Sequence, residues 1–296
     1  MARILRHKKV RRLGWGLGGF AFFGGVVLLV GSGFSGCMSF SITDKEAAER
    51  FRVRNLDPPL LESKETDPGT IHMASVGEGG NTIVFVHGSP GSWSAFIGFL
   101  MDEDLRSLGR LISVDRPGFG QSKPLKAVPS IEEQSRRISS ALKQSGVSSD
   151  AILVGHSLAG PVIARMALDY PELVKGLVLV APSMDPDLEK RKWYNYVGKF
   201  PLVKWSISKD WANSNDEIFP HKGELIDLAD RLPWIQVPTI VIQGMEDKLV
   251  PPGNADYVED RMTGVDQLKV WRIEGLNHFV PWRRPDLIVK AIEELL

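Results

Sequence analysis

The stretch AILVGHSLAG, residues 151–160, joins a short apolar run to a cluster of small residues. Its first part, Ala151–Val154, has the length and the composition of a buried strand, and a glycine ends it abruptly. Apolar residues at helical spacing then follow from position 158 to position 170. The pattern therefore predicts that Ser157 lies where a strand turns directly into a helix.

A serine at such a turn exposes its hydroxyl above the free backbone N–H groups of a helix N-terminus, which can bind a developing negative charge. The small residues Gly155, Ala159 and Gly160 let the helix fold back against the strand. The segment resembles the nucleophile motif G-x-S-x-G of the α/β-hydrolase family, with Ala159 in place of the last glycine. The alternative is a serine that only caps the helix.

The composition limits the classes of partner. The chain has 296 residues, of which 43% are hydrophobic, so it can form one large core with an N-terminal appendage. Its 36 basic and 36 acidic residues balance, so we expect no nucleic-acid partner. Cys37 is the single cysteine, which excludes an intramolecular disulfide and a cysteine-cluster metal site.

Residues 1–37 are predicted to be a signal peptide or membrane anchor. Six basic residues lie within the first twelve positions, and Leu13–Phe34 follows without a charge, which is about the 20 residues that a bilayer requires. The small residues before Cys37 resemble a bacterial lipoprotein signal, which implies lipidation of this cysteine. The alternative is an uncleaved anchor with an inert thiol. Both place the rest of the chain at the membrane, on its extracytoplasmic side.

Residues 38–69 are predicted to be a linker. Thr43 and Glu46 have the spacing of a helix N-cap and its reciprocal glutamate, which predicts a short helix that ends near Arg54. The proline-containing stretch Asn55–Thr70 is interpreted as a loosely packed spacer.

Residues 70–296 alternate between predicted strands and predicted helices, which indicates an α/β fold with a mostly parallel central sheet covered by helices on both faces. The other expected strands are 70–76 and 81–86 around a turn at 77–80, 110–114, 176–181, 239–243 and 268–273. The other expected helices are 92–105, 131–145 and 285–296.

Two further loops resemble those of the α/β-hydrolase family: HGSPG at 87–91 and DRPGFGQS at 115–122. The first resemblance implies that the backbone N–H groups of Ser89 and Leu158 form an oxyanion hole. It also implies a structural role for His87, and Asp115 is expected to bond local backbone N–H groups.

The remaining members of a catalytic triad follow from the same resemblance. Asp247 matches the acid of a G-x-x-D-x-x-V-P pattern in preference to Glu246, and His278 follows the last strand, where the family keeps its base. The order Ser157, Asp247, His278 is that of this fold's triad. Neither a metal nor an organic cofactor is expected.

Between residues 183 and 233 the alternation stops, which predicts a small helical cap. Its aromatic residues either line a substrate pocket or bury the cap against the core, and we expect the second for most of them. Near a membrane they could also lie at the interface. The expected activity is hydrolysis of a small-molecule ester or lipid-like substrate through an acyl-enzyme. The alternatives are carbon–carbon bond, amide or lipid acyl hydrolysis by the same triad, or a non-catalytic, membrane-tethered binding protein.

Overall fold

The computed structural model describes residues 41–296. These residues belong to one compact unit, Phe40–Leu296. The predictions for residues 1–37, including the lipidation of Cys37, lie outside the described residues. Between residues 41 and 296, no helix combines the length and the apolar character that a membrane span requires.

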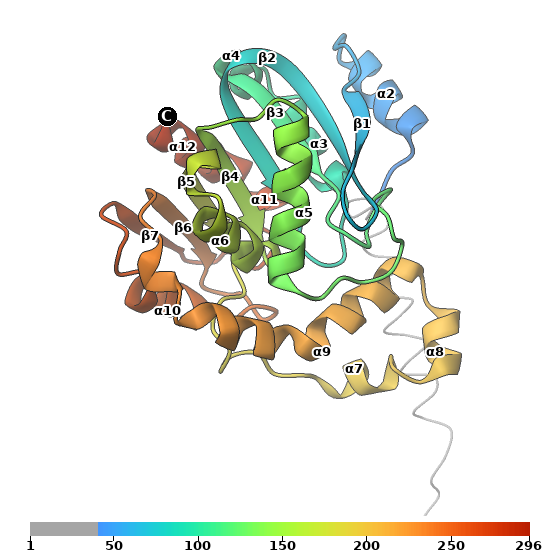
Figure 1. Cartoon of the computed structure of the whole chain (residues 1–296), viewed down its shortest axis with the longest axis vertical. Coiled ribbons are helices and arrows are strands. Elements are labelled where there is room, and N and C mark those ends of the chain that lie inside the picture. The colour runs from blue at the N-terminus through green and yellow to red at the C-terminus, as the bar shows by residue number, and fades with distance from the viewer. Residues whose placement is uncertain (1–40) are drawn as a thin grey trace, which may run out of the picture. The chain divides into compact units, whose positions relative to one another are not determined.

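A single twisted sheet forms the centre of the described structure (Figure 1). Its strands are β1 (Leu60–Glu65), β2 (Thr70–Val86), β3 (Gly109–Val114), β4 (Ala151–His156), β5 (Val174–Val180), β6 (Thr239–Gly244) and β7 (Leu268–Ile273). They lie in the order β1-β2-β4-β5-β6-β7, and β3 also pairs with β2. From β2 to β7 the neighbours along this path run parallel, whereas β1 runs antiparallel to β2.

Strand β2 reverses its direction around the predicted turn at 77–80. In its first half Met73 lies opposite Val114 of β3, and the register runs backwards from there. In its second half Thr82 lies opposite Arg110, and the register runs forwards. The two expected strands are therefore one long, curled element whose halves flank β3, and Figure 1 shows this curl.

Helices cover both faces of the sheet, as expected. Alternate residues of each buried strand point to opposite faces, so that Val84 and Val86 belong to one apolar cluster and Ile83 and Phe85 to the other. The first cluster includes side chains from α5 (Ile131–Gln144), α6 (Ala159–Asp169) and α10 (Gly253–Arg261); the second includes side chains from α2 (Asp44–Val53), α3 (Ile97–Leu100), α4 (Glu103–Leu108) and α12 (Pro285–Leu295).

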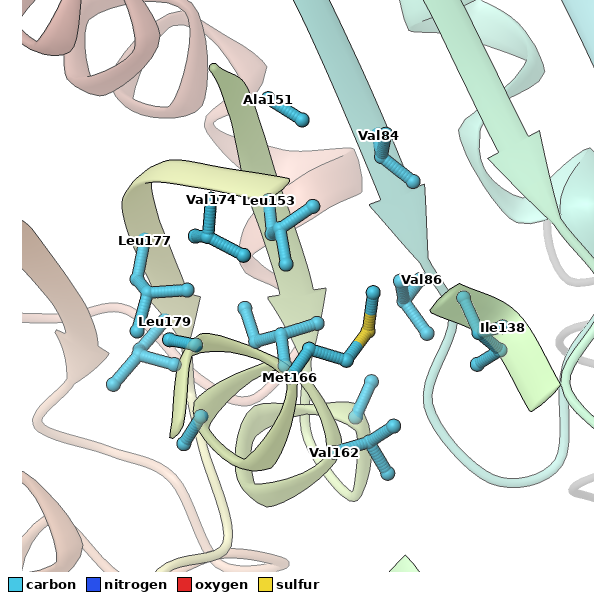
Figure 2. Packing of buried hydrophobic residues seen from close by; sticks show 14 of the residues in the cluster. Val84, Val86, Ile138, Ala151, Leu153, Val162, Met166, Val174, Leu177 and Leu179 are labelled. Atoms are coloured by element: carbon cyan, nitrogen blue, oxygen red, sulfur yellow. The ribbon is translucent and has the colours of Figure 1, made fainter. Parts of the chain in front are cut away.

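Figure 2 shows how α6 is fixed against the sheet. Met166 and Val162 of this helix pack with Leu153 of β4 and Leu179 of β5, and all four side chains are fully buried. Burial of one such side chain contributes about 1.5–3 kcal/mol. This contact holds the N-terminus of α6 beside the end of β4, where Ser157 lies.

Two local expectations need correction. The helix expected at 92–105 is divided into a short 3-10 turn (Trp93–Phe96), α3 and α4, because Asp102 interrupts it and its carboxylate caps α4 by accepting from the Leu105 N–H at 3.0 Å. The predicted spacer contains β1, which extends the sheet at its edge. The expected capping box of Thr43 and Glu46 is present at the start of α2.

The segment that follows β5 consists of α7 (Trp193–Val197), α8 (Pro201–Ser206), α9 (Lys209–Ala229) and a 3-10 turn (Leu232–Trp234). The preferred explanation for its aromatic residues, burial against the core, is wrong for most of them. Trp205 is 85% exposed and Phe200 is 64% exposed, whereas Phe219 is partly buried. A 3-10 turn (Pro171–Leu173) and α11 (Val280–Arg283) complete the helices of the described residues.

Candidate active site

Ser157 lies in the tight turn between β4 and α6. Its φ is +58°, a backbone conformation that costs a non-glycine residue roughly 1–3 kcal/mol and that is found at catalytic turns. Gly155 allows the helix to approach, because a Cβ there would lie 2.9 Å from the Ala159 carbonyl oxygen and from Ile163 Cδ1. The local structure is therefore the strained strand-to-helix turn expected from the sequence.

Asp247 and His278 meet at the same edge of the sheet, after β6 and β7. His278 Nδ1 and Asp247 Oδ2 are 2.6 Å apart, and both residues are buried. The other carboxylate oxygen accepts from the N–H groups of Leu249 and Val250, at 2.8 Å each. These bonds fix the aspartate, which in turn fixes the imidazole ring. Glu246 is exposed, so the structure brings Asp247 to the histidine and leaves Glu246 in solvent.

The His278 ring lies beside the residue that precedes the serine. Its centroid is 4.7 Å from that of His156, and His156 Nε2 is 3.0 Å from the His278 carbonyl oxygen. Since Nδ1 bonds to Asp247, the opposite nitrogen, Nε2, is the one left to receive a proton. No hydrogen bond joins the Ser157 hydroxyl to the His278 ring, and catalytic hydrogen bonds of this kind commonly shorten only when substrate binds.

The HGSPG loop passes directly over the serine. A Cβ on Gly88 would lie 3.0 Å from Ser157 Cβ, so a larger residue there would require the neighbouring groups to move. The Gly88 carbonyl accepts from Arg116 Nη2 at 3.1 Å and lies 2.7 Å from His87 Nδ1. Because the N–H of a trans peptide points away from its C=O, these contacts direct the Ser89 N–H away from Arg116. Among the described residues, the N–H groups of Ser89 and Leu158 have no hydrogen-bond acceptor.

The two residues expected to be structural have structural contacts. His87 Nε2 accepts from the Arg116 N–H at 3.0 Å, so both of its ring nitrogens are engaged within the loops. The Asp115 carboxylate accepts from the N–H groups of Trp93 and Gln121, at 2.6 and 2.8 Å. Burial raises the pKa of Asp115 to about 7 despite these two bonds.

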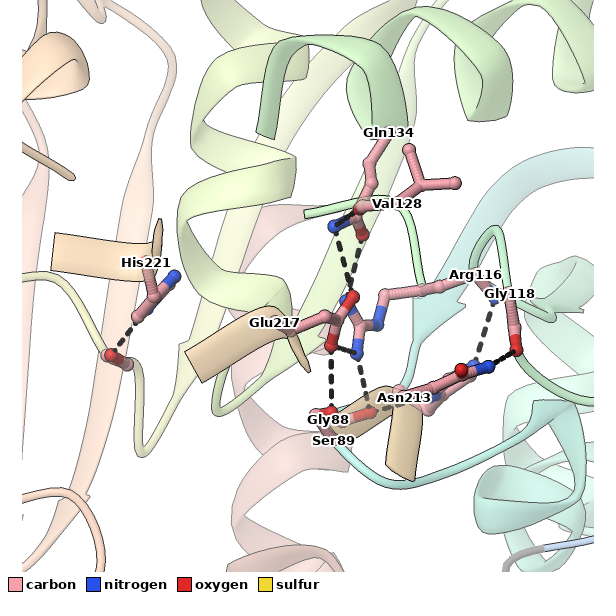
Figure 3. A network of polar contacts seen from close by, with 11 residues as sticks. Gly88, Ser89, Arg116, Gly118, Val128, Gln134, Asn213, Glu217 and His221 are labelled. Atoms are coloured by element: carbon pink, nitrogen blue, oxygen red, sulfur yellow. Dashed lines mark hydrogen bonds and ion pairs between the residues drawn. The ribbon is translucent and has the colours of Figure 1, made fainter. Parts of the chain in front are cut away.

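Sequence reasoning missed a buried ion pair between Arg116 and Glu217 of α9. Two guanidinium nitrogens each lie 3.0 Å from a Glu217 oxygen, and the side chains are 1% and 3% exposed. Glu217 also accepts from Ser89 Oγ at 2.8 Å and from Gln134 at 3.3 Å (Figure 3). The network therefore joins α9 to the loop that carries the Ser89 N–H. The signal in the sequence was an arginine two positions after a strand, since a guanidinium buried there needs an anionic partner.

A second contact between α9 and the site involves His221. Its Nε2 lies 2.9 Å from Ser183 Oγ, which also bonds to Glu189, and the Ser183 N–H donates to the Ser157 carbonyl oxygen at 3.2 Å. Burial lowers the pKa of His221 to about 4 and that of His156 to about 3. Both rings are therefore neutral at pH 7.

Comparison with known proteins agrees with this architecture. A family model described as alpha/beta hydrolase fold matches residues 81–204. The 2-hydroxy-6-oxononadienedioate/2-hydroxy-6-oxononatrienedioate hydrolase 1 of Pseudomonas putida is 23% identical over 86% of this chain and 99% of its own length.

Among solved structures, Est816, described as an N-acyl homoserine lactone degrading enzyme, superposes with a TM-score of 0.66 at 20% identity. The alignment covers 79% of this chain and 100% of Est816. A membrane phospholipase A described as a bacterial virulence factor superposes with a TM-score of 0.65 at 20% identity, over 93% of this chain and 97% of its own. The sheet order, the strained turn at Ser157 and the match to the family model together show that this chain has the α/β-hydrolase fold.

Proposed function

We propose that this protein is a serine hydrolase that cleaves carboxylic esters through an acyl-enzyme intermediate. The fold and the hydrolase relatives support the coarser class, a hydrolase. The observation that carries the proposal is the 2.6 Å contact of His278 Nδ1 with Asp247, on a ring that packs beside the strained serine turn. A serine that only capped a helix would need neither partner.

In the proposed mechanism, Ser157 Oγ attacks the carbonyl carbon of the ester while His278 Nε2 takes its proton. Asp247 stabilises the imidazolium and holds the ring in the required tautomer. The backbone N–H groups of Ser89 and Leu158 bind the oxyanion, a contribution of about 3–4 kcal/mol per donor at comparable sites. His278 then protonates the leaving alcohol and activates the water that releases the acid.

Carbon–carbon bond hydrolysis is the second candidate, because the relative from Pseudomonas putida is named as a hydrolase of 2-hydroxy-6-oxononadienedioate, a compound without an ester bond. The substrate in that name is a dioate, which carries two carboxylates. Burying a carboxylate requires a cationic or hydrogen-bonding partner. The buried cation nearest to the oxyanion loop, Arg116, is already neutralised by Glu217. This favours a neutral ester over a dianionic substrate.

A fluorophosphonate probe, which reacts with activated serines, tests the catalytic class. We expect wild-type protein to be labelled, Ser157→Ala to be unlabelled, and the exposed control Ser149→Ala to be labelled normally. Folded wild-type protein that stays unlabelled would contradict the proposal and favour the non-catalytic binding protein.

Substrate profiling tests the bond that is cleaved. We expect turnover of p-nitrophenyl esters, with a preference for short acyl chains if the substrate is a small ester and for long chains if it is a lipid. Faster turnover of a 2-hydroxy-6-oxo-dienedioate than of any ester would establish the carbon–carbon alternative.

We also propose that residues 1–37 tether the enzyme to a membrane on the extracytoplasmic side, through a lipid on Cys37. The support is the basic and apolar pattern of the sequence. Cys37→Ala should abolish incorporation of labelled palmitate. Continued membrane attachment without palmitate in the wild type would favour an uncleaved anchor.

A further inference from the structure

The outer side of the cap presents large apolar side chains to solvent. Six of them lie on α7, on α8 and in the connection between these helices, and each is 45–85% exposed: Trp193, Tyr194, Tyr196, Phe200, Leu202 and Trp205. Single exposed apolar residues are normal on protein surfaces, but a contiguous group marks an interaction site. We name α7, α8 and their flanks, residues 190–209, the cap face.

The cap face is strongly basic. Residues 190–209 contain six basic side chains, all exposed, and no acidic one. Three of the six are engaged within the cap: Lys204 pairs with Asp216, Arg191 donates to the Phe219 carbonyl oxygen, and Lys199 Nζ lies 3.5 Å from the centroid of the Phe219 ring. Lys190, Lys192, Lys199 and Lys209 form no ion pair with a described residue. The chain as a whole is neutral, so this concentration of charge is local.

The cap face is held in a defined shape by α9. Asn195 of α7 is buried and bonds to Asn215 at 3.0 Å, and the Tyr196 ring packs edge-on against Phe219 with centroids 5.5 Å apart. Figure 1 shows α7 and α8 along the side of α9 that is turned away from the sheet. Since α9 holds these helices from within, their exposed aromatic residues are available to an external surface.

We infer that the cap face docks on the surface of a lipid bilayer that carries anionic headgroups. Tryptophan and tyrosine favour the boundary between headgroups and acyl chains, and lysines beside them are attracted to anionic lipids. A second copy of this chain is a poorer partner, because a symmetric contact would bring the unpaired lysines of one cap face against those of the other. The inference does not depend on the proposed ester hydrolysis.

A label on Trp205 tests the contact in the full-length protein. Trp205→Cys in a Cys37→Ser background carries an environment-sensitive fluorophore, and its emission is measured with vesicles of phosphatidylcholine alone or mixed with phosphatidylglycerol. We expect a blue shift with the mixed vesicles and little shift with neutral ones. The matched control is a label on Trp234, which is 69% exposed but lies outside the cap face and should not respond.

Salt and charge removal complete the test. The Debye length falls from about 10 Å at 0.1 M salt to about 3 Å at 1 M. Raising the salt concentration over this range should therefore strongly decrease the blue shift of the label at position 205. Replacing Lys190, Lys199 and Lys209 by glutamine should also abolish it while the turnover of a soluble ester is unchanged. An unshifted label in anionic vesicles, an equal shift in neutral ones, or a lipid-independent shift that grows with protein concentration would each overturn the inference.

Discussion

Replacement of Glu217 by glutamine tests the buried ion pair that joins α9 to the HGSPG loop, which carries Ser89. Glutamine keeps the size of the side chain but leaves the Arg116 cation without a counter-charge in a site that is 1–3% exposed. Removing one partner of a buried pair costs about 3–5 kcal/mol of folding free energy. For a domain of this size, each 1 kcal/mol lowers the Tm by about 2–4 °C. We therefore expect Glu217→Gln to lower the Tm by roughly 6–20 °C.

The same substitution should slow catalysis, because Arg116 bonds to the Gly88 carbonyl oxygen and Glu217 bonds to the Ser89 hydroxyl, and these contacts position the peptide between the two residues. Loss of one oxyanion donor lowers kcat by about 10²–10³-fold, which sets the upper limit for a misplaced Ser89 N–H. Urea unfolding followed by circular dichroism gives the stability, and p-nitrophenyl ester hydrolysis gives kcat and KM. A fall in kcat with little change in KM would indicate a disturbed transition-state contact.

Two comparisons distinguish the effect of the unpaired buried charge from a non-specific loss of stability. Glu133→Gln breaks a partly exposed pair with Arg136 on α5 and should cost only about 0–1 kcal/mol. The double variant Arg116→Met/Glu217→Leu removes both charges and should be more stable than Glu217→Gln, since no buried charge is left unpaired. A loss below about 1 kcal/mol in Glu217→Gln, or a double variant that is less stable still, would refute this reasoning.

Three further outcomes are expected. Asp247→Asn should lower kcat by about 10⁴-fold with little change in the fold, because the His278 ring loses its anionic partner; equal kcat in both proteins would exclude the triad. Gly155→Ala should cost about 1–3 kcal/mol by urea unfolding, since its Cβ meets Ile163 at 2.9 Å, and an unchanged midpoint would contradict the packing. The pKa of His221 is about 4 in the folded protein and about 6.5 in the unfolded chain. Between pH 6.5 and pH 4 the unfolded chain therefore binds more protons than the folded protein. The free energy of unfolding should fall by about 3 kcal/mol as the pH is lowered over this range. In His221→Gln this part of the acid dependence should be absent, and an unchanged pH profile of unfolding would show that His221 does not cause it.

The sequence alone predicted the fold class and the residues that meet at the edge of the sheet, because each of these features has a local pattern within a short segment. The apolar run before Ser157 and the small residues after it specify a strand, a turn and a helix within ten positions. Asp247 and His278 each follow a predicted strand, and the carboxyl ends of parallel strands meet at one edge. The parallel arrangement of the strands therefore predicts that these residues, which are far apart in the chain, lie close together.

Tertiary structure decided the features that depend on which surfaces come together. Arg116 and Glu217 are about a hundred positions apart, and no local pattern pairs a residue of the cap with a residue after β3. The exposure of Trp205 was also unreadable, because an aromatic residue at helical spacing has the same pattern whether its helix faces the core or the solvent. Local sequence therefore determined the elements and the positions of the reactive groups, whereas long-range packing determined the buried charges around them and the apolar side chains left outside.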